Sequence, residues 1–230
     1  DAYAPKYMTN VISFKEFIEN VIDDDSFEKC IEKSYPSDVI SFIYTSGTTG
    51  NPKAGVITNA NVISSIKHLP KILDISQKDL TIAYLPLAHI AERLLGHFLK
   101  LVCGNQTAFA ESIEDMPNNV RQVGPSIMFG TPRVFEKFYA KIATGIADAT
   151  WFQKKIYYWA IDIGKETSKS KGSDSFFLKI KEFMAKYLIY NKIKKIFGGR
   201  IRYMVSGAAP ISPDIVHFFN WMSITILEGY

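Results

Sequence analysis

One stretch decides how this chain is interpreted: Tyr44-Thr45-Ser46-Gly47-Thr48-Thr49-Gly50-Asn51-Pro52-Lys53. The residues before it, 39–44, are apolar and β-favouring, so the stretch is expected to be a loop that leaves the end of a strand. Glycine tolerates positive φ and leaves amide groups open to a ligand, while hydroxyls add donors and Lys53 adds positive charge. Such a loop suits a polyphosphate; the alternative is a flexible surface linker. The expected phosphate-binding residues are Thr45, Ser46, Gly47, Thr48, Thr49, Gly50 and Lys53.

The loop differs from the P-loop of the common NTPases, whose pattern is G-x-x-x-x-G-K-[ST]. Counted from Gly47, Pro52 stands where the second glycine is needed; counted from Gly50, Gly55 fits the second glycine but Val56 stands where lysine is needed, so neither register fits. Proline also prevents a helix from continuing through this position.

Composition limits the function classes. The chain has 230 residues with 47% hydrophobic content, which is enough for a buried core and one or two domains. A net charge of +4 does not indicate nucleic acid as a partner. Two widely separated cysteines, Cys30 and Cys103, fit a reducing compartment and no zinc site. No apolar run reaches membrane-spanning length, and no signal peptide is visible.

Strands and helices are expected to alternate, which indicates an α/β fold with layered, largely parallel sheets flanked by helices. The chain divides into a lead-in at 1–38, an α/β core with the phosphate loop at 39–147, a helical insert at 148–200 and a strand-helix-strand unit at 201–230. Expected strands are 39–44, 55–58, 80–85, 106–110, 126–129, 201–206 and 224–227; expected helices are 13–22, 61–73, 89–102, 113–123, 132–146 and 213–222.

The insert is expected to contain helices at 151–165 and 176–197 around a polar segment at 167–175. Apolar residues recur at helical spacing in the second helix, with lysines between them: Phe176, Ile180, Phe183, Met184, Tyr187 and Leu188. Such a helix can lie on a membrane or admit an amphiphilic substrate. The commoner arrangement buries the apolar face in the core with the lysines in water, and we expect that one.

The segment Leu85-Pro86-Leu87-Ala88-His89-Ile90-Ala91-Glu92-Arg93 follows an expected strand and opens a helix. His89, Glu92 and Arg93 are spaced to share one helix face. The H-E-x-x-H pattern is absent, so zinc is not expected, and a surface ion pair of Glu92 is the simple expectation.

A second candidate site is Ser206-Gly207-Ala208-Ala209-Pro210, at the carboxyl end of an expected strand, where open α/β sheets bind ligands. Small residues give a flat backbone surface that suits a planar base. A tight strand-to-helix turn is the alternative.

As a string, the phosphate loop closely resembles the signature of the adenylate-forming enzymes, a family that includes the acyl-CoA synthetases. The segments at 85–93, Gly130-Thr131-Pro132-Arg133-Val134-Phe135-Glu136-Lys137 and 206–210 resemble its long-chain fatty acid branch. Ala54 and Asn59 depart from the usual glycine and histidine after the lysine. The resemblance implies catalytic roles for Lys53 and Thr45 and a fatty acid pocket at His89. It assigns adenine binding to Gly207, Ala208, Ala209, Pro210, Glu228, Gly229 and Tyr230.

The resemblance further implies that the intact protein uses ATP and Mg²⁺ to convert a long-chain fatty acid into an acyl-adenylate, then transfers the acyl group to coenzyme A. The chain resembles a middle part of the large N-terminal domain, without the C-terminal domain and with no metal ligand of its own, so alone it is expected to be inactive. The expected location is the cytoplasmic side, with a peripheral membrane contact left open. Adenylation of an aryl or amino acid, or a non-catalytic nucleotide- or lipid-binding role, are the alternatives.

Overall fold

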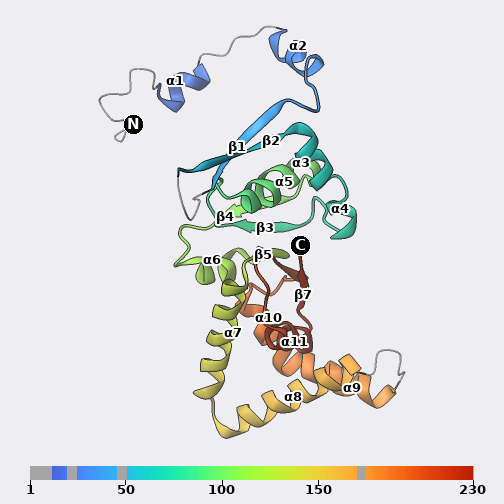
Figure 1. The fold of residues 1–230 in the computed structure, drawn as a ribbon. Coiled ribbons are helices and arrows are strands. Elements are labelled where there is room, and N and C mark those ends of the chain that lie inside the picture. Colours follow the sequence, from blue (N-terminus) through green and yellow to red (C-terminus); the bar gives the residue numbers. More distant parts are fainter. Residues whose placement is uncertain (1–11, 20–24, 46–50, 170–174, 230) are drawn as a thin grey trace.

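The computed structural model describes residues 12–19, 25–45, 51–169 and 175–229 (Figure 1). The strands are β1 Val39–Thr45, β2 Lys53–Thr58, β3 Leu80–Ala83, β4 Gln106–Phe109, β5 Ile127–Gly130, β6 Tyr203–Ser206 and β7 Thr225–Glu228. The α-helices are α1 Phe14–Glu19, α2 Ser26–Glu32, α3 Asn59–Ile66, α4 Leu69–Ile72, α5 Leu99–Cys103, α6 Met116–Val123, α7 Pro132–Ala147, α8 Trp151–Lys169, α9 Phe176–Ala185, α10 Asn191–Ile196 and α11 Pro213–Trp221. Two segments are π-helices, η1 Glu92–Phe98 and η2 Lys186–Tyr190.

Parallel pairing dominates, as expected: β3 pairs with β4, and β6 lies between β5 and β7, all in parallel. The exception is an antiparallel hairpin of β1 and β2. The connection between these two strands spans only residues 46–52, whereas a parallel crossover needs about a dozen residues or more. The phosphate-loop candidate therefore connects two antiparallel strands.

Strand β3 also lies beside β5, since the Ser126 amide just before β5 donates to the Leu80 carbonyl at 2.8 Å. Buried Asp79 fixes this junction. It accepts hydrogen bonds from Ser126 Oγ at 2.8 Å and from Arg202 Nη1 at 2.8 Å. Burial alone would raise the Asp79 pKa, but these donors and the Ser76 amide together lower it. The network lies at the amino ends of the strands, opposite the edge where ligands are expected.

Two hydrophobic clusters form the core. The larger surrounds β5–β7 and is built mainly from fully buried side chains, including Met128, Phe135, Phe138, Phe197, Met204 and Phe219. The smaller joins α3, α4 and α5 through Val62, Ile66, Ile75, Leu99, Cys103 and Ile127. These clusters hold both sets of parallel strands in place beneath the candidate site.

Helix boundaries agree with expectation where a proline starts the helix or a glycine follows its end. Pro132 starts α7, and Gly198 and Gly199, with φ of 76° and 83°, follow the end of α10. Several expectations were wrong in detail, among them the single helix expected at 61–73, which is two helices, α3 and α4. Residues 92–98 form a π-helix rather than a regular α-helix, and the helix expected from 113 begins at Met116. These last two deviations border the cavity described below.

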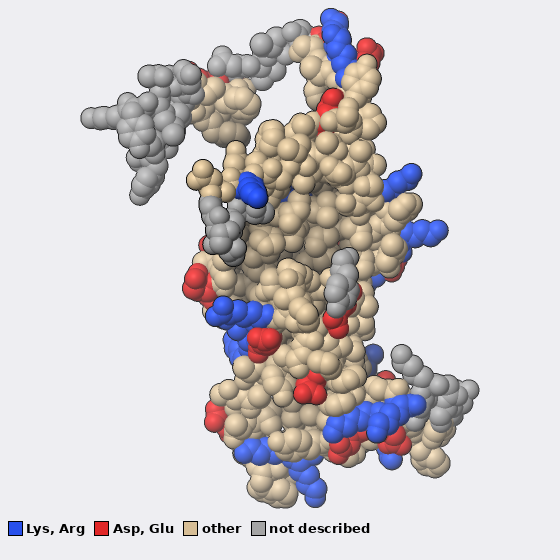
Figure 2. Space-filling model, in the orientation of Figure 1, with Lys and Arg blue, Asp and Glu red and all other residues tan. Residues whose placement is uncertain are grey.

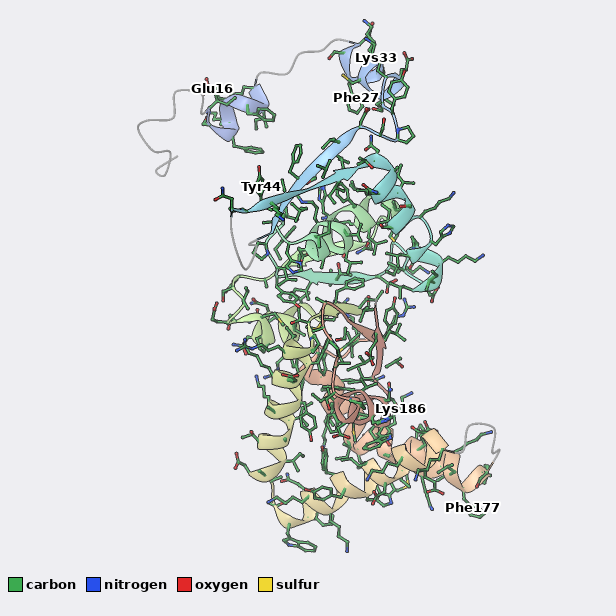
Figure 3. All side chains as sticks on the ribbon, in the orientation of Figure 1. Glu16, Phe27, Lys33, Tyr44, Phe177 and Lys186 are labelled. Atoms are coloured by element: carbon green, nitrogen blue, oxygen red, sulfur yellow. The ribbon has the colours of Figure 1, made fainter. Side chains whose placement is uncertain are left out.

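The expectation that the apolar face of residues 176–197 packs on the core is wrong for most of that face. Leu178 and Ala185 are buried, but five of the six residues named for the stripe are exposed: Phe176, Ile180, Phe183, Met184 and Tyr187. Figure 3 shows Phe177 projecting from α9 away from the rest of the molecule. The inner face of α9 packs mainly against α8.

Candidate active site

The adenine-site candidates meet at the carboxyl ends of three parallel strands. β5, β6 and β7 end at Gly130, Ser206 and Glu228, which are in register. The Gly207 amide donates to the Gly130 carbonyl at 3.1 Å, and the Gly229 amide donates to the Ser206 carbonyl at 2.8 Å. A Cβ on Gly207 would lie 3.6 Å from the Gly229 carbonyl oxygen, so the two glycines face each other. The result is a flat backbone corner that we call the glycine corner, Gly207–Pro210 with Glu228 and Gly229.

Two features of the glycine corner are typical of functional sites. Ala208 has a φ of +69°, a left-handed conformation that costs a residue with a Cβ about 1–2 kcal/mol. The Ser206 hydroxyl is buried and has no hydrogen-bond partner among the described residues. Ala209 and Pro210 are exposed beside them, and Tyr230 lies outside the described residues.

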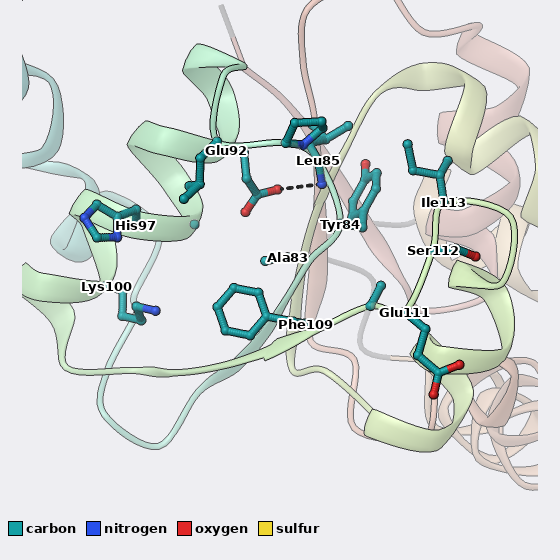
Figure 4. A pocket seen from close by; sticks show the side chains of 14 residues that line it. Ala83, Tyr84, Leu85, Glu92, His97, Lys100, Phe109, Glu111, Ser112 and Ile113 are labelled. Atoms are coloured by element: carbon teal, nitrogen blue, oxygen red, sulfur yellow. Dashed lines mark hydrogen bonds between the residues drawn. The ribbon is translucent and has the colours of Figure 1, made fainter. Parts of the chain in front are cut away.

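A cavity of about 470 Å³ opens at the carboxyl ends of β3 and β4 (Figure 4). That volume lies within the range of small-molecule sites, about 300–1,000 Å³. Most of its walls are apolar, and the residues that line it come from the 85–93 segment, from η1 and α5, and from the stretch after β4. They are Ala83, Tyr84, Leu85, Pro86, Leu87, Glu92, Gly96, His97, Lys100, Phe109, Ala110, Glu111, Ser112 and Ile113.

Glu92 is the buried carboxyl group of this cavity, so the expectation of a surface ion pair for it was wrong. Only 8% of Glu92 is exposed, and its Oε2 accepts a hydrogen bond from the Leu85 amide at 3.1 Å. Figure 4 shows the carboxyl group pointing from η1 toward the strand end. Burial raises the pKa of Glu92, against smaller opposing effects of the Leu85 and Tyr84 amides, His89 and Lys100. Its neutral form is therefore favoured relative to an exposed glutamate.

Gly96 provides the space that Glu92 occupies. A Cβ at Gly96 would lie 1.8 Å from Glu92 Oε1 and 2.9 Å from its Cδ, far inside contact distance. The two residues are four apart in η1, where the π-helical winding widens the turn. The local sequence E-x-x-x-G thus folds a carboxyl group back against its own helix.

Tyr84 connects the cavity to the glycine corner. Its ring lines the cavity, and a Cβ on Gly130 would lie 3.2 Å from its hydroxyl oxygen. Gly130 is the residue whose carbonyl binds the Gly207 amide. Burial raises the pKa of Tyr84 to about 12, so the hydroxyl stays protonated as a donor. The cavity and the glycine corner are therefore neighbouring parts of one site.

The hairpin of the phosphate-loop candidate is attached to the same region. Arg93 Nη1 donates to Ser41 Oγ on β1 at 2.7 Å, and its Nε donates to the Leu87 carbonyl at 2.8 Å. Thr45 and Lys53 are partners in the β1–β2 register, at the two ends of the turn, and Lys53 is exposed. Residues Ser46, Gly47, Thr48, Thr49 and Gly50 lie outside the described residues, so their phosphate-binding role stays a prediction.

His89 lies beside the cavity segment but is exposed and does not line the cavity. Its Nδ1 accepts a hydrogen bond from the Ala91 amide at 3.2 Å, which orients the ring at the start of the helix. Sequence reasoning missed Tyr84, Gly96 and the lining residues Phe109 and Ile113. The position of Tyr84 directly before the 85–93 segment was the available signal; the others depend on how η1 packs over β4.

Comparison with known proteins identifies the family of the chain. The family model described as "AMP-binding enzyme" matches residues 6–230. The chain belongs to the AMP-binding enzyme family. This membership confirms the resemblance to adenylate-forming enzymes deduced from the loop.

Curated relatives of this AMP-binding chain include long-chain-fatty-acid–CoA ligases. ACSBG1 of Macaca fascicularis is 30% identical over 98% of this chain and 32% of the relative, and ACSBG2 of Xenopus laevis is 30% identical over 96% and 31%. The chain thus spans about a third of the length of these relatives.

Solved structures share the fold. Apo MatB from Rhodopseudomonas palustris matches with a TM-score of 0.55 at 16% identity, over 85% of this chain and 29% of that one. The adenylation domain of a carboxylate reductase from Mycobacterium chelonae matches with a TM-score of 0.54 at 20% identity, over 85% of this chain and 27% of that one.

Proposed function

We propose that the intact protein containing this AMP-binding chain activates a long-chain fatty acid with ATP and transfers the acyl group to coenzyme A. The observation that carries this proposal is the largely apolar cavity that adjoins the glycine corner through Tyr84 and Gly130. An acyl chain in the cavity would place its carboxylate beside a nucleotide at the corner. The names of the 30%-identical relatives support the same substrate class.

The reaction begins when a carboxylate oxygen attacks the α-phosphorus of ATP, forming an acyl-adenylate and releasing pyrophosphate. The thiol of coenzyme A then attacks the acyl carbon and AMP leaves, so no covalent enzyme nucleophile is needed. The first step brings like charges together. Lys53 and the donors of residues 45–50 would offset that charge, since preorganised donors and cations stabilise a transition state most where charge develops.

The cavity would bind the acyl chain mainly through burial of methylene groups, each contributing about 0.8 kcal/mol. The glycine corner would hold adenine, because Gly207 and Gly229 present backbone without side chains. Mg²⁺ is expected with ATP, but the described residues contain no group of three His, Cys, Asp or Glu side chains that could hold it. We therefore assign no step to a metal ligand of this chain.

A cavity-filling variant tests the proposal. Ile113 lines the cavity and is 47% exposed, so Ile113→Trp can narrow the cavity without disturbing the core. In the full-length protein it should lower kcat/KM for long fatty acids more than for short ones and leave the KM for ATP unchanged. Ile72→Trp, at a 72% exposed site on α4, is the matched control. An equal loss for all chain lengths, or none, would contradict the assignment of the cavity.

A further inference from the structure

The outer face of α9 carries a continuous apolar surface that the proposed ligase chemistry does not use. We define the α9 face as Phe176, Phe177, Ile180, Phe183, Met184 and Tyr187, the last from η2. Their exposure is high, reaching 70% for Phe176, 76% for Phe177, 71% for Phe183 and 73% for Tyr187. Large apolar side chains gathered in this way mark an interaction surface.

The arrangement around the helix is that of an interfacial helix. At about 100° per residue, the α9-face residues from Phe176 to Met184 occupy an arc of roughly 120°. Leu178 and Ala185 point the other way and are buried, and α9 packs against α8. Lys179 and Lys181 follow about 40° beyond the two edges of the apolar arc. The apolar arc thus faces outward with a lysine on each side.

Charge in this region is strongly one-sided. Residues 176–197 contain six lysines, Lys179, Lys181, Lys186, Lys192, Lys194 and Lys195, against one acidic residue, Glu182. Figure 2 shows basic side chains over the α8–α9 end of the molecule, with acidic ones among them. In Figure 3, Lys186 lies at the end of α9 opposite to Phe177.

We propose that the α9 face binds the surface of an anionic lipid bilayer. Aromatic side chains would insert at the headgroup level, and the flanking lysines would contact anionic headgroups. The helix would lie in the interface and not cross it: among the helices of the described ranges, none is both long and apolar enough to span a membrane. This inference does not depend on the ligase proposal, because it rests on α9 alone.

Vesicle co-sedimentation of the full-length protein tests the inference. Binding should be stronger to vesicles of phosphatidylcholine with phosphatidylserine than to phosphatidylcholine alone, and should weaken as salt screens the lysines. Phe176→Ser with Phe183→Ser should lower the partition coefficient about tenfold or more, given the apolar area removed. Phe14→Ser with Phe27→Ser, at exposed sites of α1 and α2, is the matched control and should bind as wild type. Equal vesicle binding by wild type and the α9 double variant would overturn the inference.

A labelling experiment separates lipid from other occupants of the α9 face. Phe183→Cys, carrying an environment-sensitive fluorophore, should label readily without vesicles and shift to shorter wavelength when anionic vesicles are added. Lys141→Cys, at an exposed position of α7, should label but show no shift. If position 183 resists labelling without vesicles, another part of the protein or a second copy covers it, and the membrane assignment is wrong. Labelling without any vesicle-induced shift would also contradict it.

Discussion

Gly96→Ala offers a quantitative test of the cavity wall, because the added methyl group and the Glu92 carboxyl group compete for one space. The Cβ would lie 1.8 Å from Glu92 Oε1, so the carboxyl group must rotate away and release the Leu85 amide. Leaving the Leu85 amide without its acceptor costs about 1–3 kcal/mol. Replacing glycine by alanine within a helix stabilises the folded state by about 1 kcal/mol. The net destabilisation should be up to about 2 kcal/mol.

The sign of the effect should reverse in a Glu92→Ala background. There the alanine methyl group meets no carboxyl oxygen, so Gly96→Ala should stabilise by the helix contribution of about 1 kcal/mol. Glu92→Ala alone should destabilise by about 1–3 kcal/mol, because it leaves the Leu85 amide without its acceptor. The two substitutions should therefore show a coupling energy of about 1–3 kcal/mol.

The assay is urea unfolding of wild type, both single variants and the double variant of the full-length protein, followed by tryptophan fluorescence. The chain supplies Trp159 and Trp221 near the larger hydrophobic cluster as reporters. If Gly96→Ala changes the unfolding free energy by the same amount and sign in both backgrounds, the packing of Glu92 against Gly96 is not as described.

Three further predictions concern the rest of the site and the fold. Lys53→Ala should raise the barrier to adenylate formation by about 2–4 kcal/mol, measured as fatty-acid-dependent pyrophosphate release; an unchanged rate would contradict the phosphate assignment. Gly207→Val should raise the KM for ATP while circular dichroism stays native, whereas Gly207→Ala should be mild because its Cβ has an ordinary 3.6 Å contact. Asp79→Asn should destabilise by about 3 kcal/mol at pH 7. Hydrogen bonds lower the pKa of Asp79 in the folded state, so the carboxylate stabilises the fold above its unfolded pKa of about 3.9, and this contribution is lost as the pH falls through the lower folded-state pKa. Urea unfolding at pH 7 and pH 3 should therefore show that the stability deficit of Asp79→Asn is smaller at pH 3. An equal deficit at both pH values would refute this.

Much of the fold could be predicted because the decisive signals are local. Pro132 and the Gly198–Gly199 pair set helix ends through backbone restrictions. The antiparallel pairing of β1 and β2 was not among the expectations. The glycine corner was predictable too, since small residues at the end of a parallel strand usually mark a ligand edge. Family membership then followed from the order of these short motifs.

The cavity and the α9 face could not be predicted in the same way, because they depend on contacts between distant segments. The local sequence does not indicate that Gly96 leaves space for the Glu92 carboxyl group, or that residues after β4 form a wall of the cavity. The periodicity of α9 was recognised correctly, but periodicity does not say which side faces solvent. Leu178 and Ala185 are the buried residues of α9, and its aromatic residues are exposed.

The central claim is tested most directly by ATP–pyrophosphate exchange in the full-length protein, measured with a panel of fatty acids of increasing chain length and with aryl and amino acids. We predict exchange that depends on the fatty acid and is fastest with long chains. Exchange with aryl or amino acids but not with long chains would contradict the fatty acid assignment while leaving adenylation intact. A complete absence of exchange with every carboxylate would contradict the enzymatic account and favour a binding role.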